Sequence, residues 1–222
     1  MPEDLDRECE TIINNFLREK YGVVNFPVST SDLTCLVERA AHDLDLYADL
    51  SAFGPDVEGL TEFSPGQKPN VKISAPLAED KRRENRLRTT LTHEYGHVRF
   101  HTYLWELERP QHKLFENNPN ANGQICKRDN ILNAAQADWM EWQAGYVCGA
   151  LLMPMNPVKR LVGEYKESHD LYGVIGINDR HGQNLIEAMQ SDFQVSADAA
   201  RVRLIKLGFL GETGAGPSLF GR

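Results

Sequence analysis

The chain has 222 residues, of which 41% are hydrophobic and 25% are charged. This length and composition predict one globular domain with its own core, and they exclude a disordered chain or a small scaffold that needs disulfides to fold. Acidic residues outnumber basic residues by 32 to 24, and the resulting net charge of −8 argues against a nucleic-acid-binding protein.

The sequence contains no stretch that predicts a membrane-spanning helix. Its longest apolar run, residues 144–153, is about half of the ~20 residues that a span requires. The N-terminal residues are acidic and lack the apolar segment of a signal peptide, so we expect no secretory leader. The cysteines are far apart and form no Cys-x-x-Cys pair, so we expect reduced thiols and a cytoplasmic protein.

Hydrophobic spacing predicts a chain built mainly of helices with one short β segment. Residues 102–130 contain several Pro, Asn and Gly residues and are expected to be mostly loop. Two β-prone runs, residues 57–63 and 70–74, flank a turn-forming stretch and predict a hairpin or meander. In chain order, the first helix is expected over residues 3–20, and the second follows the capping residues 29–32. Further helices are expected over residues 79–101, 134–152 and 196–207.

One motif carries recognisable chemistry. Residues 93–97 read His-Glu-Tyr-Gly-His and match the pattern His-Glu-x-x-His, which this composition would produce by chance about 0.02 times per chain. On a helix, His93 and His97 lie one turn apart and about 40° apart around the axis, so both can bind one metal ion. Glu94 is offset by about 100°, so it can reach a water on that ion without being a ligand.

The rest of this helix supports a role for the motif. A set of apolar residues lies opposite the histidine pair and can bury against a core, so we expect the histidine face to line a cleft. This set comprises Leu87, Leu91, Tyr95 and Val98.

His101 stands one turn beyond His97 and is a second candidate ligand. However, it lies about 12 Å from His93 along the helix axis, so these two residues cannot share an ion. We therefore expect His101 to contact a ligand from behind or to be structural.

Glu141 is the candidate for the third protein ligand that a catalytic zinc ion requires. It stands in an otherwise apolar helical stretch, where a carboxylate is costly unless it is paired or bound to a metal. The alternative is that Glu141 faces solvent, although Gly145, Cys148 and Leu152 share its face. Cys148 lies about 10 Å away along the axis and is expected to be a small buried residue rather than a ligand.

Three stretches of the sequence resemble the ImmA/IrrE family of zinc metallopeptidases. The first is residues 86–101, RLRTTLTHEYGHVRFH, which are similar to the active-site helix of that family. The second is Glu-Trp-Gln-Ala at residues 141–144, which leads into Leu-Leu-Met-Pro at residues 151–154. The third and weaker likeness is residues 193–208, and residues 57–74 also look like the short β segment of the family.

The resemblance implies an α+β fold, mainly helical and zincin-like, in which the helices pack on a small twisted antiparallel sheet. It implies one Zn²⁺ ion held by His93, His97 and Glu141, with Glu94 as the general base of peptide-bond hydrolysis. It also implies a cytosolic endopeptidase that cleaves a helix-turn-helix transcriptional repressor and so relieves repression of a stress response or a mobile element.

The chain departs from the family pattern in two places. Gly145 stands where Asn is common, and the interval between His97 and Glu141 is long. We therefore expect a single domain over residues 1–210 with an insertion at about 102–137, either a substrate lid or an inert surface segment. Residues 211–222 are expected to form a flexible tail.

Two other functions remain open at this stage. The first is a non-proteolytic metal-binding regulator that binds a protein or DNA, with residues 193–208 as part of a helix-turn-helix that exposes Arg201, Arg203 and Lys206. Direct DNA binding is disfavoured by the acidic charge balance and by the better match of these residues to a packed amphipathic helix. The second is a small-molecule amidase or deformylase, against which the Glu ligand argues. Candidates for the oxyanion donor are Tyr146, Tyr172, His169 and His181.

Overall fold

The computed structural model describes residues 2–64, 66–107, 123–127 and 139–212. The chain divides into two compact units. The terminal unit combines Met1–Pro27 with Gly149–Arg222, and the central unit is Val28–Cys148. Helix α6 (Trp139–Leu152) passes from the central to the terminal unit. The single domain predicted over residues 1–210 stays a prediction, because two compact units can also fold as one domain.

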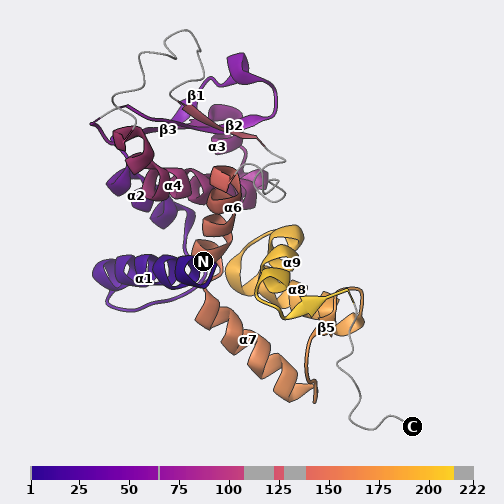
Figure 1. Cartoon of the computed structure of the whole chain (residues 1–222). Coiled ribbons are helices and arrows are strands. Elements are labelled where there is room, and N and C mark those ends of the chain that lie inside the picture. The colour runs from indigo at the N-terminus through magenta and orange to yellow at the C-terminus, as the bar shows by residue number, and fades with distance from the viewer. Residues whose placement is uncertain (1, 65, 108–122, 128–138, 213–222) are drawn as a thin grey trace. The chain divides into compact units, whose positions relative to one another are not determined.

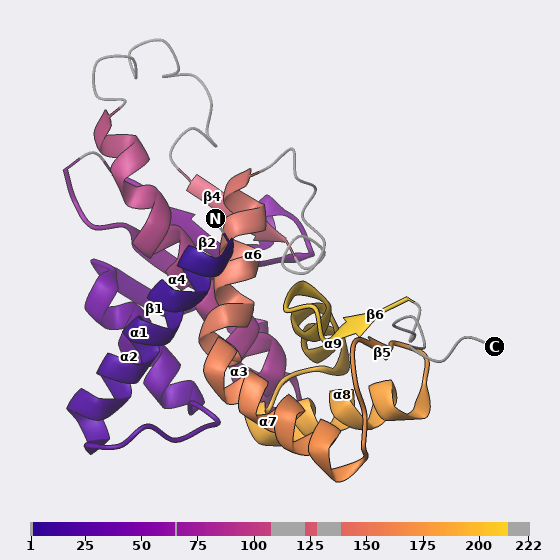
Figure 2. The same cartoon turned by 60° about the horizontal axis from the view of Figure 1, so that its bottom comes forward.

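The terminal unit is a group of helices with one short pair of strands (Figure 2). Its α1 buries an apolar stripe that includes Cys9, Ile13 and Leu17. Ser196 caps α9 by accepting a hydrogen bond from the Ala199 backbone N–H. Its elements are α1 (Pro2–Tyr21), α7 (Met155–Ser168), β5 (Ile175–Gly176), α8 (Arg180–Phe193), α9 (Ala197–Lys206) and β6 (Leu210–Gly211).

A buried ion pair joins the two ends of this unit. The guanidinium of Arg203 on α9 donates to Asp6 Oδ1 on α1 at 2.6 Å and to the Met153 carbonyl at 2.9 Å. The side chains of Arg203 and Asp6 are only 2% and 3% exposed. The expectation that Arg203 is exposed for DNA contact is therefore wrong, because its charge is neutralised inside the unit.

The central unit consists of a four-stranded sheet with helices (Figure 1). The strand order is β1-β3-β2-β4, in which β2 pairs antiparallel with β3 and with β4. Its elements are α2 (Thr30–Ala40), β1 (Asp43–Ala48), the 3₁₀ turn Ser51–Phe53, β2 (Val57–Glu62), β3 (Asn70–Ser74), α3 (Ala75–Glu79), the 3₁₀ turn Lys81–Arg83, α4 (Glu84–Leu107) and β4 (Gly123–Lys127).

The α+β class and the predicted hairpin are confirmed, but the sheet is mixed rather than purely antiparallel. Strand β1, which the sequence pattern did not predict, runs parallel to β3. Two observed elements also lie inside the predicted loop: α4 continues to Leu107, and β4 adds a strand to the sheet beside β2. The rest of the predicted 102–137 insertion lies outside the described residues, as do residues 213–222 of the predicted tail.

Helix α4 occupies the centre of this unit. It contacts α2 and strands β2, β3 and β4, and Figure 1 shows it along one face of the sheet. Leu91, Tyr95 and Val98 are buried and Leu87 is half-buried, so the predicted apolar face is confirmed for three of its four residues. Within the described residues, no helix is long and apolar enough to cross a membrane.

Removing one partner of the buried ion pair should strongly destabilise the terminal unit. In Asp6→Ala, the Arg203 guanidinium would remain buried without its carboxylate, so we expect a loss of about 3–5 kcal/mol in the free energy of unfolding. The exposed pair between Asp198 and Arg201 provides the control, since Asp198→Ala should leave stability nearly unchanged. Urea denaturation of the two variants tests this, and equal effects would contradict the assigned burial.

Candidate metal centre

Two helices bring three candidate metal ligands together inside the central unit. His93 and His97 lie one turn apart on α4, and Glu141 lies in the first turn of α6. The Nε2 atoms of His93 and His97 are 3.0 Å apart, and they lie 3.3 Å and 3.1 Å from the two oxygens of Glu141. In the part of the chain that the structure describes, this is the one group of three or more such side chains that could hold a metal ion.

A close approach between α4 and α6 makes this arrangement possible. A Cβ atom on Gly96 would lie only 3.1 Å from the Cα atom of Ala144, so a larger residue would push the helices apart. Thr92 also donates its hydroxyl to Cys148 Sγ at 3.2 Å, which joins the same two helices. The Gly inside the His-Glu-x-x-His motif and the Ala three positions after Glu141 are thus explained by helix packing.

The three side chains suit one small cation with nitrogen and oxygen ligands. A tetrahedral ion at ~2.0–2.1 Å from its ligands separates the ligand atoms by about 3.3 Å. The observed separations of 3.0, 3.1 and 3.3 Å are close to that value. Two imidazoles and a carboxylate suit Zn²⁺ and other divalent metals alike, so the geometry supports one metal ion without selecting the element.

Burial sets the protonation states of these ligands. It lowers the pKa of His97 to about 3, so the imidazole is neutral near pH 7. Burial acts to raise the pKa of Glu141, but hydrogen bonds from His93 and His97 outweigh it and leave the pKa below its usual value. A neutral imidazole and an ionised carboxylate are the forms that bind a cation.

Glu94, the predicted general base, points toward strand β2 and is completely buried. The hydroxyl of Thr61 on β2 donates to Glu94 Oε2 at 2.5 Å. Gly59, two residues earlier on the same face of β2, leaves room for the carboxylate, because a Cβ atom there would overlap with Glu94 Oε1. Neither residue was predicted from the sequence, in which the only signal for them is a Gly inside a β-prone run.

The histidine face of α4 is enclosed. His93, Glu94 and His97 are 0% exposed, and Glu141 is 2% exposed. The expectation that this face lines an open cleft therefore differs from the structure, because α6 and β2 cover it. The alternative that Glu141 faces solvent is also wrong.

His101 lies behind His97, on the side away from Glu141. Its Nδ1 atom is 2.9 Å from His97 Nδ1, and its Nε2 atom is 2.9 Å from Gln143 Oε1 on α6. The indole ring of Trp139 packs edge-on against the His101 ring, with centroids 5.3 Å apart. This agrees with the expectation that His101 contacts a ligand from behind and is not itself a ligand.

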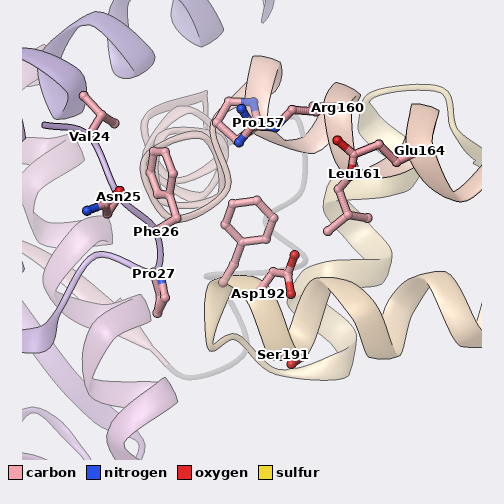
Figure 3. A pocket seen from close by; sticks show the side chains of 11 residues that line it. Val24, Asn25, Phe26, Pro27, Pro157, Arg160, Leu161, Glu164, Ser191 and Asp192 are labelled. Carbon is pink, nitrogen blue, oxygen red and sulfur yellow. The ribbon is translucent and has the colours of Figure 1, made fainter.

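A separate hollow of about 560 Å³ lies in the terminal unit (Figure 3). Arg160 and Glu164 from α7, Asp192 from α8 and Phe26 are among its lining residues. It contains no His or Cys side chain, so it offers neither a nucleophile–base pair nor a metal-binding cluster.

The oxyanion donor stays a prediction. Tyr146 lies on α6 in the central unit, where it is buried beside Trp142. Tyr172, His169 and His181 belong to the terminal unit, where His169 and His181 pack around Tyr165.

No family model matches the chain, and no curated protein sequence matches it.

The metal-free protein should lose stability as the pH falls below about 6.5. The pKa of His97 is 6.5 when exposed and about 3 in the folded chain. The unfolded chain therefore takes up a proton first, which favours unfolding by up to about 1.4 kcal/mol per pH unit between these values. The lowered pKa of Glu141 adds a similar loss in the free energy of unfolding only below about pH 4.5, the ordinary pKa of a glutamate. Unfolding measured at about pH 7, 6 and 5 should show a steeper loss for the wild type than for His97→Gln, and parallel slopes would refute the assignment.

The space beside Glu94 should not tolerate a methyl group. In Gly59→Ala, the new Cβ atom would meet the Glu94 carboxylate and lie 2.9 Å from Thr90 Cγ2. We expect a loss of about 1–3 kcal/mol in the free energy of unfolding. The loss caused by Gly59→Ala should be smaller in a Glu94→Ala background, where the carboxylate is absent. Gly163→Ala on α7 is the matched control, because its Cβ would meet nothing within 4 Å and should be neutral or stabilising. Thermal denaturation compares them, and similar effects at both positions would count against this geometry.

Proposed function

We propose that this chain is a zinc-dependent endopeptidase of the ImmA/IrrE type. The observation that carries the proposal is the buried group of His93, His97 and Glu141, with Glu94 directly after the first ligand in sequence. The histidine pair and the third ligand come from different helices, so tertiary packing brings together a ligand set that matches the motif. The choice of zinc, the peptidase activity and the family are inferred from the resemblance of the sequence motifs.

Each residue has a defined task in the proposed reaction. His93, His97 and Glu141 would hold a divalent ion, which would supply a Lewis acid for the scissile carbonyl and lower the pKa of water. Glu94 takes a proton from the attacking water and later gives it to the leaving amine nitrogen. The Thr61 hydroxyl holds one carboxylate oxygen of Glu94, which limits the rotation of the base.

The proposed substrate is a protein, in particular a helix-turn-helix transcriptional repressor in the cytoplasm, whose cleavage would relieve repression of a stress response or a mobile element. This substrate class rests on the resemblance of residues 86–101 and 141–154 to the family motifs.

One observation favours the second candidate function, a metal-binding regulator without peptidase activity. The side chains of His93, Glu94 and His97 are 0% exposed, whereas a catalytic zinc ion needs a position open to water and substrate. A closed site of this kind also suits a structural or sensing ion. Binding to DNA through α9 is a weaker form of this alternative, since Arg203 is buried against Asp6.

Metal analysis and cleavage of a peptide library together separate these functions. We expect about one zinc ion per wild-type chain and a sharp reduction in Glu141→Ala. Glu94→Gln should keep its zinc but cleave a library of bacterial proteome peptides about 10²–10⁴-fold more slowly, since it removes the base.

Glu167→Gln on the exposed end of α7 is the matched control and should cleave like the wild type. Equal cleavage by Glu94→Gln and the wild type would refute the peptidase mechanism. Stoichiometric zinc without any cleavage in the wild type would favour the regulator. A wild-type protein that binds no zinc even after the metal is added back would refute both the peptidase and the metal-binding regulator.

A further inference from the structure

The hollow of about 560 Å³ in the terminal unit has the size of a small-molecule site. Three segments of the chain line it, namely residues 24–27, one face of α7 and the last turn of α8 (Figure 3). The lining residues of α7 stand at positions 157, 160, 161 and 164, which is the i, i+3, i+4, i+7 spacing of a single helix face. The hollow is therefore built from secondary structure on two sides, and a ligand there would meet fixed side-chain positions.

The apolar part of the lining is largely aromatic. The rings of Phe26 and Phe193 have centroids 5.9 Å apart and are tilted by 55°. Phe193 is buried, whereas Phe26 and Leu161 are half-buried and so keep apolar surface that a ligand can cover. Such a wall suits a ring or a branched hydrocarbon group.

The charged part of the lining is not neutralised within the protein. Arg160, Glu164 and Asp192 are exposed and form no hydrogen bond or ion pair with any described residue. Arg160 and Glu164 lie four residues apart on α7, about 6 Å along its axis, a spacing at which opposite charges commonly pair. Because they stay apart, both can bind a ligand.

The two signs of charge have different surroundings. Asp192 lies in the last turn of α8, where the carbonyl groups of the helix end carry partial negative charge. Together with Glu164 it makes a region that favours a cation, whereas Arg160 supplies a binding group for an anion. A simple organic cation would leave Arg160 without a partner, and a simple anion would face two carboxylates. A ligand that carries both charges satisfies all three side chains.

A free α-amino acid has this combination of groups. Its ammonium group has three N–H donors, which Glu164 and Asp192 can share. Its carboxylate, attached to the same carbon atom, can accept two hydrogen bonds from the Arg160 guanidinium. A bulky apolar side chain would cover the wall that Phe26 and Leu161 provide.

We propose that this hollow binds a free α-amino acid with a bulky apolar side chain. Glu164 and Asp192 bind its ammonium group, and Arg160 binds its carboxylate. The inference concerns the terminal unit alone, so it does not rest on the metal centre or on peptidase activity.

A series of ligands, measured by titration calorimetry on the full chain, tests each group of the ligand separately. L-phenylalanine should bind, and L-alanine, which lacks the apolar body, should bind about 10–100-fold more weakly. L-phenylalaninamide lacks the carboxylate and N-acetyl-L-phenylalanine lacks the ammonium group, so each should also bind about 10–100-fold more weakly. Equal affinity for L-phenylalanine and either derivative would overturn the proposal, as would the absence of binding by L-phenylalanine, L-leucine and L-tryptophan at millimolar concentration.

Substitutions in the hollow test which side chain binds which group. Glu164→Gln should weaken L-phenylalanine binding about 10–100-fold but should not weaken binding of N-acetyl-L-phenylalanine, which has no ammonium group to lose. Arg160→Gln should weaken L-phenylalanine binding by a similar factor but should not weaken binding of the amide. Both side chains are exposed, so neither substitution should change the free energy of unfolding.

Glu187→Gln is the matched control, because Glu187 is an exposed carboxylate on α8 that does not line the hollow. This variant should bind L-phenylalanine like the wild type. Unchanged affinity for L-phenylalanine in Glu164→Gln or in Arg160→Gln would refute the proposal, and so would an equal loss in Glu187→Gln.

Discussion

The central constraint in this protein is the burial of a carboxylate between two imidazole rings. Glu141 is 2% exposed, and its oxygens lie 3.1 Å and 3.3 Å from two completely buried histidine nitrogens. An ionised carboxylate is costly in such a place unless a cation or donors compensate it. The small residues Gly96 and Ala144 make this arrangement possible, because they let α4 and α6 approach closely enough for the two imidazoles and the carboxylate to meet.

The sheet supplies the second part of the site. Strand β2 presents Gly59 and Thr61 on one face toward α4, so one residue makes room for Glu94 and the other hydrogen-bonds to it. On the opposite side, His101 and Gln143 hold the outer nitrogen of His97. His97 and Glu94 therefore receive support from different elements, α6 acting through His101 and β2 acting directly, and support of this kind is what a precise metal site requires.

The terminal unit carries a different kind of polar burial. Arg203 and Asp6 form an ion pair between residues from the two ends of the chain, and Arg203 also donates to the Met153 carbonyl. A pair of this kind contributes little net stability but is costly to break, so it favours one packing of α9 over others. It also removes a cation from the surface on which a DNA-binding interpretation would depend.

The sequence by itself determined helices α1, α2, α4, α6 and α9, the hairpin of β2 and β3, and the identity of the candidate ligands. It did not predict α3, α7 and α8 as separate helices. The elements and ligands that it did predict follow from local periodicity and from a motif whose residues share one helical turn, as His93 and His97 do. Glu141 could be nominated because a carboxylate is unexpected in an apolar helix. None of these inferences needed a contact between distant segments.

Only the tertiary structure decided which side chains meet across elements. The parallel pairing of β1, the burial of Arg203, and the contacts of Thr61, Gly59 and Gln143 depend on neighbours that are far away in sequence, 197 residues away in the case of Arg203. A periodic pattern carries no information about such partners. The closed state of the histidine face was unpredictable for the same reason: one helix shows which face is polar, but α6 and β2 decide whether that face meets water.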